Sequence, residues 1–205
     1  MIKMREAAEK DTCFRVADLM VNAAITAPKG SGRDTVVAAV VSGEDKDKLA
    51  KIMKELGEKY EEEFIVRDSG NVDNSICVVV IGCKAVPMGL PNCGLCGFKN
   101  CGEMKKAGSN CVFNVTDLGI AVGSAVSVAA DHRVDNRVMY SIGIAAREMG
   151  IFDDDVRVCW GIPLNASSKS IYFDRGVWCQ TYLWGGLTVK VHMEFVSYHV
   201  RTNTK

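Results

Sequence analysis

The sequence lacks several features that mark whole classes of protein. Its 25 basic and 25 acidic residues cancel to a formal net charge of zero, so the overall charge indicates neither a nucleic acid nor an anionic membrane as a partner. The longest apolar runs, residues 77–82 and 119–130, are shorter than the roughly 20 residues that a bilayer span needs. Charges interrupt the first ten residues, which therefore contain no signal-peptide core. We expect a soluble, cytoplasmic protein with no nucleic-acid or membrane partner.

Cysteine, in contrast, is plentiful. The chain has 205 residues and nine cysteines. A chain of this length can bury a hydrophobic core without disulfide bonds. Because nine is an odd number and the cytosol is reducing, the cysteines are better interpreted as thiols and thiolate ligands than as a disulfide framework.

Hydrophobic periodicity indicates a mixed α/β chain. Apolar residues at three- and four-residue steps predict helices over residues 5–27, 45–60, 116–130 and 136–149, with a cap at Thr116 or Asp117 for the third and at Asp135 or Asn136 for the fourth. β-Branched runs predict strands over residues 35–41 and 75–81, both buried on their two faces, and further strands over 156–161 and 187–200. We expect one α/β domain over residues 1–205, with a cysteine-rich, cluster-binding insert at 83–115.

Four cysteines of that insert fall within nineteen residues. Cys93, Cys96, Cys101 and Cys111 have the spacing C-x2-C-x4-C-x9-C. A [4Fe–4S] cluster needs one thiolate per iron, and closely spaced cysteines allow a loop to wrap around it. A glycine directly follows each of the first three cysteines and is expected to take a positive φ that brings backbone N–H groups toward the sulfurs. A helical turn after Cys101 would add further N–H donors. These four cysteines are the predicted metal ligands.

Other sites remain open on the sequence alone. A structural zinc ion also binds four thiolates, but it usually pairs two C-x2-C units, and only Cys93 and Cys96 form one here. A [2Fe–2S] centre is the next alternative, although its plant-type order is C-x4-C-x2-C. A thioredoxin-like C-x2-C would leave Cys101 and Cys111 without a role. Cys83 precedes the motif by ten residues and is placed outside the ligand set.

The remaining cysteines are expected to be buried small hydrophobic residues at positions 13, 77 and 159, and Cys179 has no evident partner. Lys99, Lys105 and Lys106 either dock an acidic redox partner or keep the insert soluble. The Gly30–Arg33 segment has phosphate-binding residue types, but a plain loop between a helix and a strand is the favoured interpretation.

With the cysteine motif, several further stretches resemble an uncharacterised family of prokaryotic proteins described as containing a ferredoxin domain. These stretches are TDLGIAVGSA at residues 116–125, VDNRVMYSIG at 134–143, GIPL at 161–164 and FDR at 173–175. The resemblance extends over roughly residues 5–175 and implies an iron–sulfur protein without a settled activity.

The helix that ends in AAITAPKGS (residues 23–31), the strand after it and the paired late helices are also similar to flavin-dependent nitroreductases. That likeness implies an α+β homodimer with FMN between its subunits, yet only Arg5 represents the usual arginine-rich opening that grips the FMN phosphate. The resulting hypothesis is an iron–sulfur redox protein, an oxidoreductase if a flavin binds, that exchanges single electrons with a partner protein or a small acceptor. The alternative is a binding or regulatory module with a structural zinc or iron–sulfur site.

Overall fold

The computed structural model describes residues 2–173, 178–184 and 187–193. Contacts group the chain into two units, Met1–Ile171 and Tyr172–Lys205, and each is described by itself. The second unit contains strands β5 (Trp178–Trp184) and β6 (Leu187–Met193), which pair antiparallel. The strand expected over 187–200 is therefore confirmed as far as residue 193, and the rest of it lies outside the described residues. The expectation of one domain over the whole chain stays a prediction.

The first unit is built on a four-stranded sheet in the order β1-β2-β4-β3. The strands are β1 (Val36–Ser42), β2 (Cys77–Lys84), β3 (Asp135–Asn136) and β4 (Val156–Asn165), and each neighbouring pair is antiparallel. β2 is central and is buried along nearly its whole length, as expected. Among the described strands β1 pairs only with β2, and most of its residues are only half-buried. The expectation that β1 is buried on both faces is therefore wrong, because it is an edge strand.

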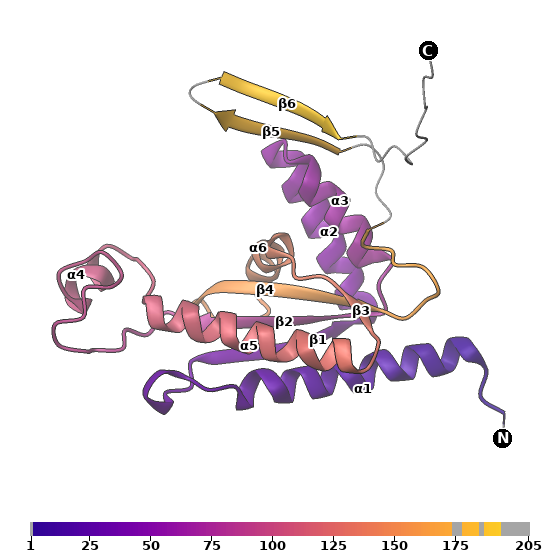
Figure 1. Ribbon diagram of the computed structural model, residues 1–205, viewed down its shortest axis with the longest axis horizontal. Helices are drawn as coiled ribbons and strands as arrows, with labels where there is room; N and C mark the ends of the chain where they lie inside the picture. Colours follow the sequence, from indigo (N-terminus) through magenta and orange to yellow (C-terminus); the bar gives the residue numbers. More distant parts are fainter. Residues whose placement is uncertain (1, 174–177, 185–186, 194–205) are drawn as a thin grey trace, which may run out of the picture. The chain divides into compact units, whose positions relative to one another are not determined.

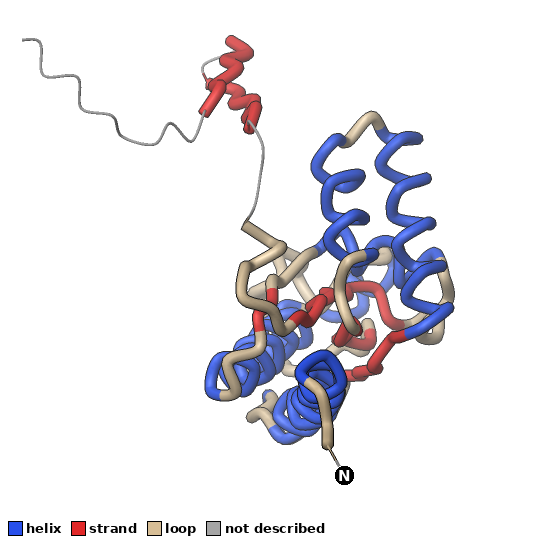
Figure 2. Tube along the Cα trace, turned by 90° about the vertical axis from the view of Figure 1, so that its right-hand side faces the viewer, coloured by secondary structure: helices blue, strands red, loops and turns tan. Residues whose placement is uncertain are grey.

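Helices cover both faces of this sheet (Figures 1 and 2). On one face α1 (Arg5–Thr26) and α5 (Val112–Asp131) lie side by side, and their apolar faces form one core cluster with the strands. The other face carries α6 (Tyr140–Glu148), with the paired helices α2 (Gly43–Tyr60) and α3 (Glu63–Asp73) beside it. Members of the cluster on the α1 and α5 face include Cys13, Met20, Cys77, Val79, Ile81, Leu118, Ala121 and Ala125.

The mixed α/β class is confirmed, and the differences from the sequence predictions are local. Helix α3 and strands β3 and β5 were not predicted. The fourth predicted helix begins at Tyr140 rather than Asn136, because Asp135 and Asn136 pair with Asn165 and Leu164 of β4. The N-cap position of α6 is therefore taken by Met139.

Among the described residues one helix, α5, is long and apolar enough to cross a membrane by length and composition, with a mean hydropathy of 1.5. Its inner residues Leu118, Ala121, Ala125 and Ala129 are fully buried in the core. A core helix of a water-soluble protein passes the same test, and the absence of a membrane span stays a prediction.

Candidate metal centre

The cysteine loop, residues 85–111, joins the end of β2 to the start of α5 and carries the short helix α4 (Cys101–Lys106). Figure 1 shows α4 beyond the end of the sheet. The four predicted ligands come from three segments of this loop. Cys93 follows a turn at residues 91–92, Cys96 lies in the next turn, Cys101 is the first residue of α4, and Cys111 directly precedes α5.

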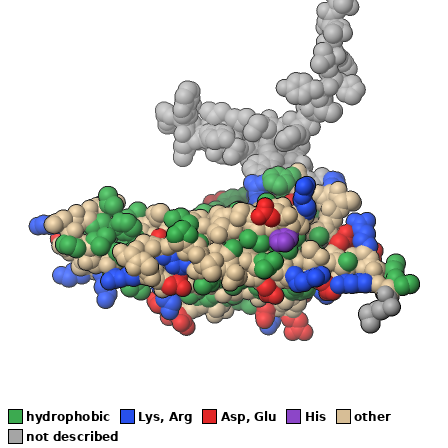
Figure 3. Space-filling model, turned by 60° about the horizontal axis from the view of Figure 1, so that its bottom comes forward, with side chains coloured by type: hydrophobic (Ala, Val, Ile, Leu, Met, Phe, Trp, Pro, Cys, Tyr) green, Lys and Arg blue, Asp and Glu red, His purple; other side chains and the backbone are tan. Residues whose placement is uncertain are grey.

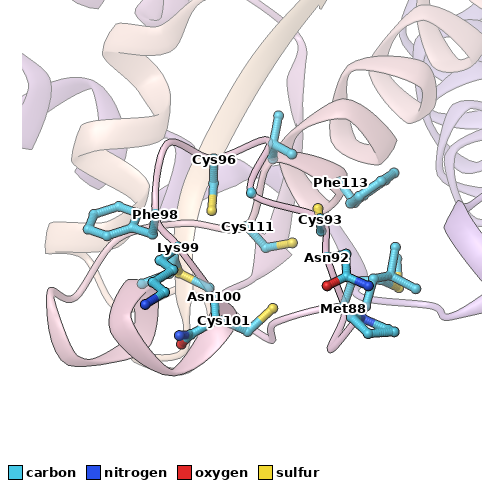
Figure 4. Close-up of a pocket in the computed structure, with 15 residues that line it drawn as sticks. Met88, Asn92, Cys93, Cys96, Phe98, Lys99, Asn100, Cys101, Cys111 and Phe113 are labelled. Carbon is cyan, nitrogen blue, oxygen red and sulfur yellow. The ribbon is translucent and has the colours of Figure 1, made fainter.

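The fold brings these four cysteines to one place. All of them line a single cavity of about 80 Å³, several times the roughly 10–15 Å³ that one water molecule requires. Figure 4 shows their thiols facing the space enclosed by the cysteine loop. Cys83, which the sequence analysis placed outside the ligand set, is not among the residues that line this cavity. The predicted residues are thus assembled, while their binding of a metal stays a prediction.

Two glycines shape the turns that present the first pair of thiols. Gly94 and Gly97 have φ values of 64° and 85°, a region that side chains with a Cβ seldom enter. The N–H of Gly97 donates to the carbonyl oxygen of Gly94 at 2.9 Å, which closes the turn around Cys96. Gly102 was also expected to have a positive φ, and that expectation is wrong, because the residue lies inside α4.

Helix α5 begins earlier than predicted, and this places Cys111. The expected cap at Thr116 or Asp117 is wrong, because Cys111 itself occupies the N-cap position and its side chain caps no N–H group. The first N–H groups of a helix have no partner within the helix, and they carry a partial positive charge that favours an anionic group. The N-terminus of a 20-residue helix therefore adjoins the cavity at its fourth thiol.

Apolar side chains surround the cysteines. Met88, Met104 and Cys111 form a small buried cluster, and Phe98 and Phe113 pack against it. These side chains keep water from part of the cavity wall. A less polar surrounding strengthens electrostatic interactions and shifts the potential of a redox centre. The remaining side of the cavity is open, since Cys93, Cys96 and Cys101 are partly exposed.

Side chains outside the loop fix its two ends. Asn114 of α5 is 2% exposed, and its amide nitrogen donates to the carbonyl oxygens of Lys84 and Val86 at 2.6 and 2.7 Å. Arg157 of β4 donates to the carbonyl oxygen of Gly108 at the other end. Both residues satisfy carbonyl groups of a segment that has few backbone bonds of its own.

The Gly30–Arg33 segment connects α1 to β1, as favoured, and contains a short 3-10 helix, η1 (Gly30–Gly32). It also contacts the cysteine loop. Arg33 Nη1 donates to the carbonyl oxygen of Met88 at 2.7 Å. The N–H of Gly30 donates to both carboxylate oxygens of Asp117, at 3.0 and 3.1 Å. Sequence reasoning missed the roles of Arg33, Asn114 and Arg157, because each acts on a backbone carbonyl far away in the sequence.

Cys13, Cys77 and Cys159 are buried, as expected, and Cys83 is buried as well. Burial raises the pKa of Cys77 and Cys83 to about 12 and that of Cys13 and Cys159 to about 11. Thiols of this kind stay protonated at neutral pH and are poor ligands unless they lose the proton to a metal. Cys179 lies in β5, outside the residues whose side chains are described.

Two kinds of metal group, a zinc ion and an iron–sulfur cluster, can be compared for the four thiols. Among the described residues, no three His, Cys, Asp or Glu side chains are placed to hold one metal ion together. A single zinc ion draws its four ligands onto one centre, whereas a cubane cluster spreads its thiolates over four irons. Four thiols line the one cavity, and the choice between a zinc ion and a cluster stays a prediction.

The fit to FMN is weaker. Arg5, the only arginine of the N-terminal opening, forms an exposed ion pair with Glu9 at 2.7 Å within α1. The Arg5 guanidinium therefore already has an acidic partner within α1. Asp174 and Arg175, the last residues of the FDR stretch, lie outside the described residues.

Comparisons with known proteins identify relatives by sequence. The family model described as an uncharacterized protein containing a ferredoxin domain matches residues 107–175, a stretch that includes Cys111 but not the first three cysteines of the motif. An uncharacterized protein from Archaeoglobus fulgidus is 45% identical over 165 residues, which cover 77% of this chain and 88% of that protein.

Solved structures with a similar fold are nitroreductases. Nitroreductase CinD from Lactococcus lactis, solved in complex with nicotinic acid, has a TM-score of 0.55 at 10% identity and covers 82% of this chain and 81% of its own. A nitroreductase from Desulfitobacterium hafniense, solved with bound FMN, has a TM-score of 0.50 at 15% identity over 76% of this chain and 78% of its own. At these identities the likeness shows the fold, and it confirms the expected nitroreductase-like architecture.

Proposed function

Because this chain belongs to the family of uncharacterized proteins containing a ferredoxin domain, we propose that it is an iron–sulfur redox protein. A [4Fe–4S] cluster bound by Cys93, Cys96, Cys101 and Cys111 would serve for one-electron transfer. The observation that carries the proposal is that these four cysteines, from three segments of the loop, line one cavity.

The chain's own groups suit such a cluster in three ways. The thiols supply one ligand per iron. The N-terminus of α5 at Cys111 offsets negative charge on the cluster. Met88 and Met104 exclude water on the inner side, while the partly exposed Cys93 and Cys96 leave the outer side accessible. When bound, the cluster supplies a centre that accepts and releases one electron without breaking a bond.

Anaerobic purification tests this function. We expect a brown protein with broad visible absorbance, about four irons per chain, and a paramagnetic signal on reduction. The Cys101→Ser variant should lose most of its iron, whereas Cys13→Ala, a change at a buried cysteine of α1, should retain it. A colourless protein that carries zinc would contradict the proposal and would favour a binding or regulatory module with a structural metal. Full iron in Cys101→Ser would contradict the assignment of Cys101 as a ligand, and Cys83→Ser in that background would then test Cys83 in its place.

We further propose FMN as a second cofactor, and only the nitroreductase-like fold supports it. A flavin released on denaturation of the purified protein would establish it and would make the protein an oxidoreductase. Protein free of flavin, before and after incubation with FMN, would contradict it. In that case the cluster alone would carry the redox function.

We also propose that the protein is a homodimer. The outer face of α5 exposes Val115 and Ile120, at 38% and 42%, and residues 118–130 contain no charged side chain. Such a face favours association with another uncharged surface. Sedimentation should give a mass near 45 kDa, twice the 22.3 kDa of one chain. Ile120→Lys should shift the protein to the monomer, and a wild-type mass of one chain would contradict the proposal.

A further inference from the structure

The cysteine loop presents an apolar patch to solvent. Leu95 is 69% exposed and Leu90 is 40% exposed. Leu90 lines the cavity, and Leu95 lies between Cys93 and Cys96 in the sequence. The same loop buries Met88 and Met104. Apolar side chains of this loop can therefore be buried, yet the two leucines remain exposed. An exposed apolar group beside a site is a common mark of an interaction surface.

Positive charge accompanies the patch. Lys99, Lys105 and Lys106 are exposed, and no ion pair joins any of them to an acidic residue in the described part of the chain. Glu103 is the one acidic residue of the loop. Three lysines and one glutamate leave a net charge of +2 on residues 85–111 before the cysteines are counted, although the whole chain has a net charge of zero. In the cluster-bound protein the thiolates would add negative charge at the centre, and the exposed lysines keep positive charge on the surface of the loop.

Neighbouring acidic groups do not cancel this charge at the loop's outer part. Asp155 lies at the base of the loop, where it is 3.5 Å from Lys84 and pairs with it. Figure 3 shows hydrophobic side chains gathered, with basic side chains beside them, at the end of the first unit where Figure 1 places α4. The exposed leucines and lysines belong to this one loop, and we call them together the docking surface: Leu90, Leu95, Lys99, Lys105 and Lys106.

The docking surface lies over the candidate ligands. Leu95 stands between Cys93 and Cys96, and Lys99 stands between Cys96 and Cys101. Figure 4 shows the Lys99 side chain extending away from the sulfurs. A protein bound to these side chains would approach the partly exposed face of the cysteines without displacing the buried methionines.

We propose that the docking surface binds an acidic one-electron carrier protein, one whose redox group lies at a negatively charged face. This inference rests on the proposed iron–sulfur function. One electron passes between the carrier and the cluster, so that one is oxidised as the other is reduced, and no bond or proton is exchanged. Opposite charges steer such encounters and set their salt dependence. Weak redox encounters use small contact areas, and a few exposed leucines with lysines on the same loop can supply one.

Charge reversal tests the docking surface. The triple variant Lys99→Glu, Lys105→Glu and Lys106→Glu changes three lysines of the surface. The matched control, Lys48→Glu, Lys51→Glu and Lys54→Glu, makes the same change in net charge on exposed lysines of α2. An acidic plant-type [2Fe–2S] ferredoxin is the probe. A basic cytochrome c, a carrier of opposite charge, is the negative control.

Binding is measured by calorimetry at low and high salt, with the chain as purified. We expect the wild type and the α2 control to bind the ferredoxin, with an affinity that falls as salt rises, and to show no affinity for cytochrome c. The loop variant should bind at least about tenfold more weakly. Failure of the wild type to bind, or equal binding by the loop variant and the control, would overturn the inference. So would self-association of the chain through this surface.

Electron transfer is followed in the same samples by stopped-flow absorbance. The rate constant with ferredoxin should fall at least about tenfold in the loop variant, while reduction by dithionite, a small reagent, should change little. Iron content separates the two proposals. Protein without iron that still binds ferredoxin through the lysines contradicts the proposed function and leaves the surface supported, whereas iron-loaded protein with unchanged rates overturns the surface alone.

Discussion

The guanidinium of Arg33 donates a hydrogen bond of 2.7 Å to the carbonyl oxygen of Met88, 55 residues later in the chain. Arg33 follows the short turn after α1, and Met88 begins the apolar wall around the cysteines. Asp117 fixes the same turn, because its carboxylate accepts from the N–H of Gly30. Residues 30–33 therefore connect α5 to the cysteine loop, and the shape of the metal centre depends on side chains outside its own motif.

We predict that Arg33→Gln weakens the hold on the cysteine loop. The loss of a hydrogen bond from a charged donor should lower the free energy of unfolding by about 1–2 kcal/mol, and iron should pass to a chelator several times faster than in the wild type. Urea unfolding and the rate of chelation measure the two effects. Arg15→Gln is the control, since Arg15 donates to a carbonyl within its own helix. Equal chelation rates for both variants would contradict the prediction.

Asn114→Leu should have a larger effect on stability. The change removes two hydrogen bonds, those to the carbonyl oxygens of Lys84 and Val86, and each is worth about 0.5–1.5 kcal/mol. The N–H of Val86 still donates to Lys84. Chemical denaturation measures the loss. Asn74→Ala serves for comparison, because Asn74 bonds a carbonyl at the exposed end of α3. Similar small losses in both variants would show that Asn114 does not hold the loop.

The sequence predicted most of the core and the four cysteines that line the cavity. It did not predict the features that depend on contacts between residues far apart in the chain. Periodicity alone located α1, α2 and β2, because each has one clear pattern of burial. The start of α5 was misplaced because Cys111 is a weak cap by residue type, and a polar residue further on was a better match. Strand β3 has only two residues, and its existence depends on pairing with β4. Donors such as Arg33 act across the fold and leave no local pattern.

High pH should destabilise the protein through its buried thiols. Burial in the folded state raises the pKa of Cys77 and Cys83 from the ordinary 9.0 to about 12. Above pH 9 the unfolded chain loses these protons while the folded chain keeps them, so the unfolded state binds fewer protons and stability falls as pH rises toward 12. Below pH 9 both states keep these protons, so the free energy of unfolding is not reduced by these thiols.

Urea unfolding between pH 8 and pH 11 measures this fall. We expect the wild type to lose more than about 2 kcal/mol over that interval. Cys77→Ala removes one of the buried thiols, so its stability should decline less steeply than that of the wild type, even though it starts lower at pH 8 because a buried sulfur is missing. Parallel curves for the wild type and Cys77→Ala would contradict a raised pKa at this thiol.

Thiol labelling should distinguish the metal-binding cysteines from the buried ones. In metal-free protein at pH 8, a maleimide should react fast with the partly exposed Cys93, Cys96 and Cys101 and slowly with Cys13 and Cys77, which are fully buried. Iron loading should protect the first three, because a thiolate bound to iron is no longer a free nucleophile. Peptide mass spectrometry locates the labels, and a chelator should restore the fast reaction. If iron protected none of the three, or if the label reached Cys13 as quickly as Cys96, the assignment of the ligand set would be wrong.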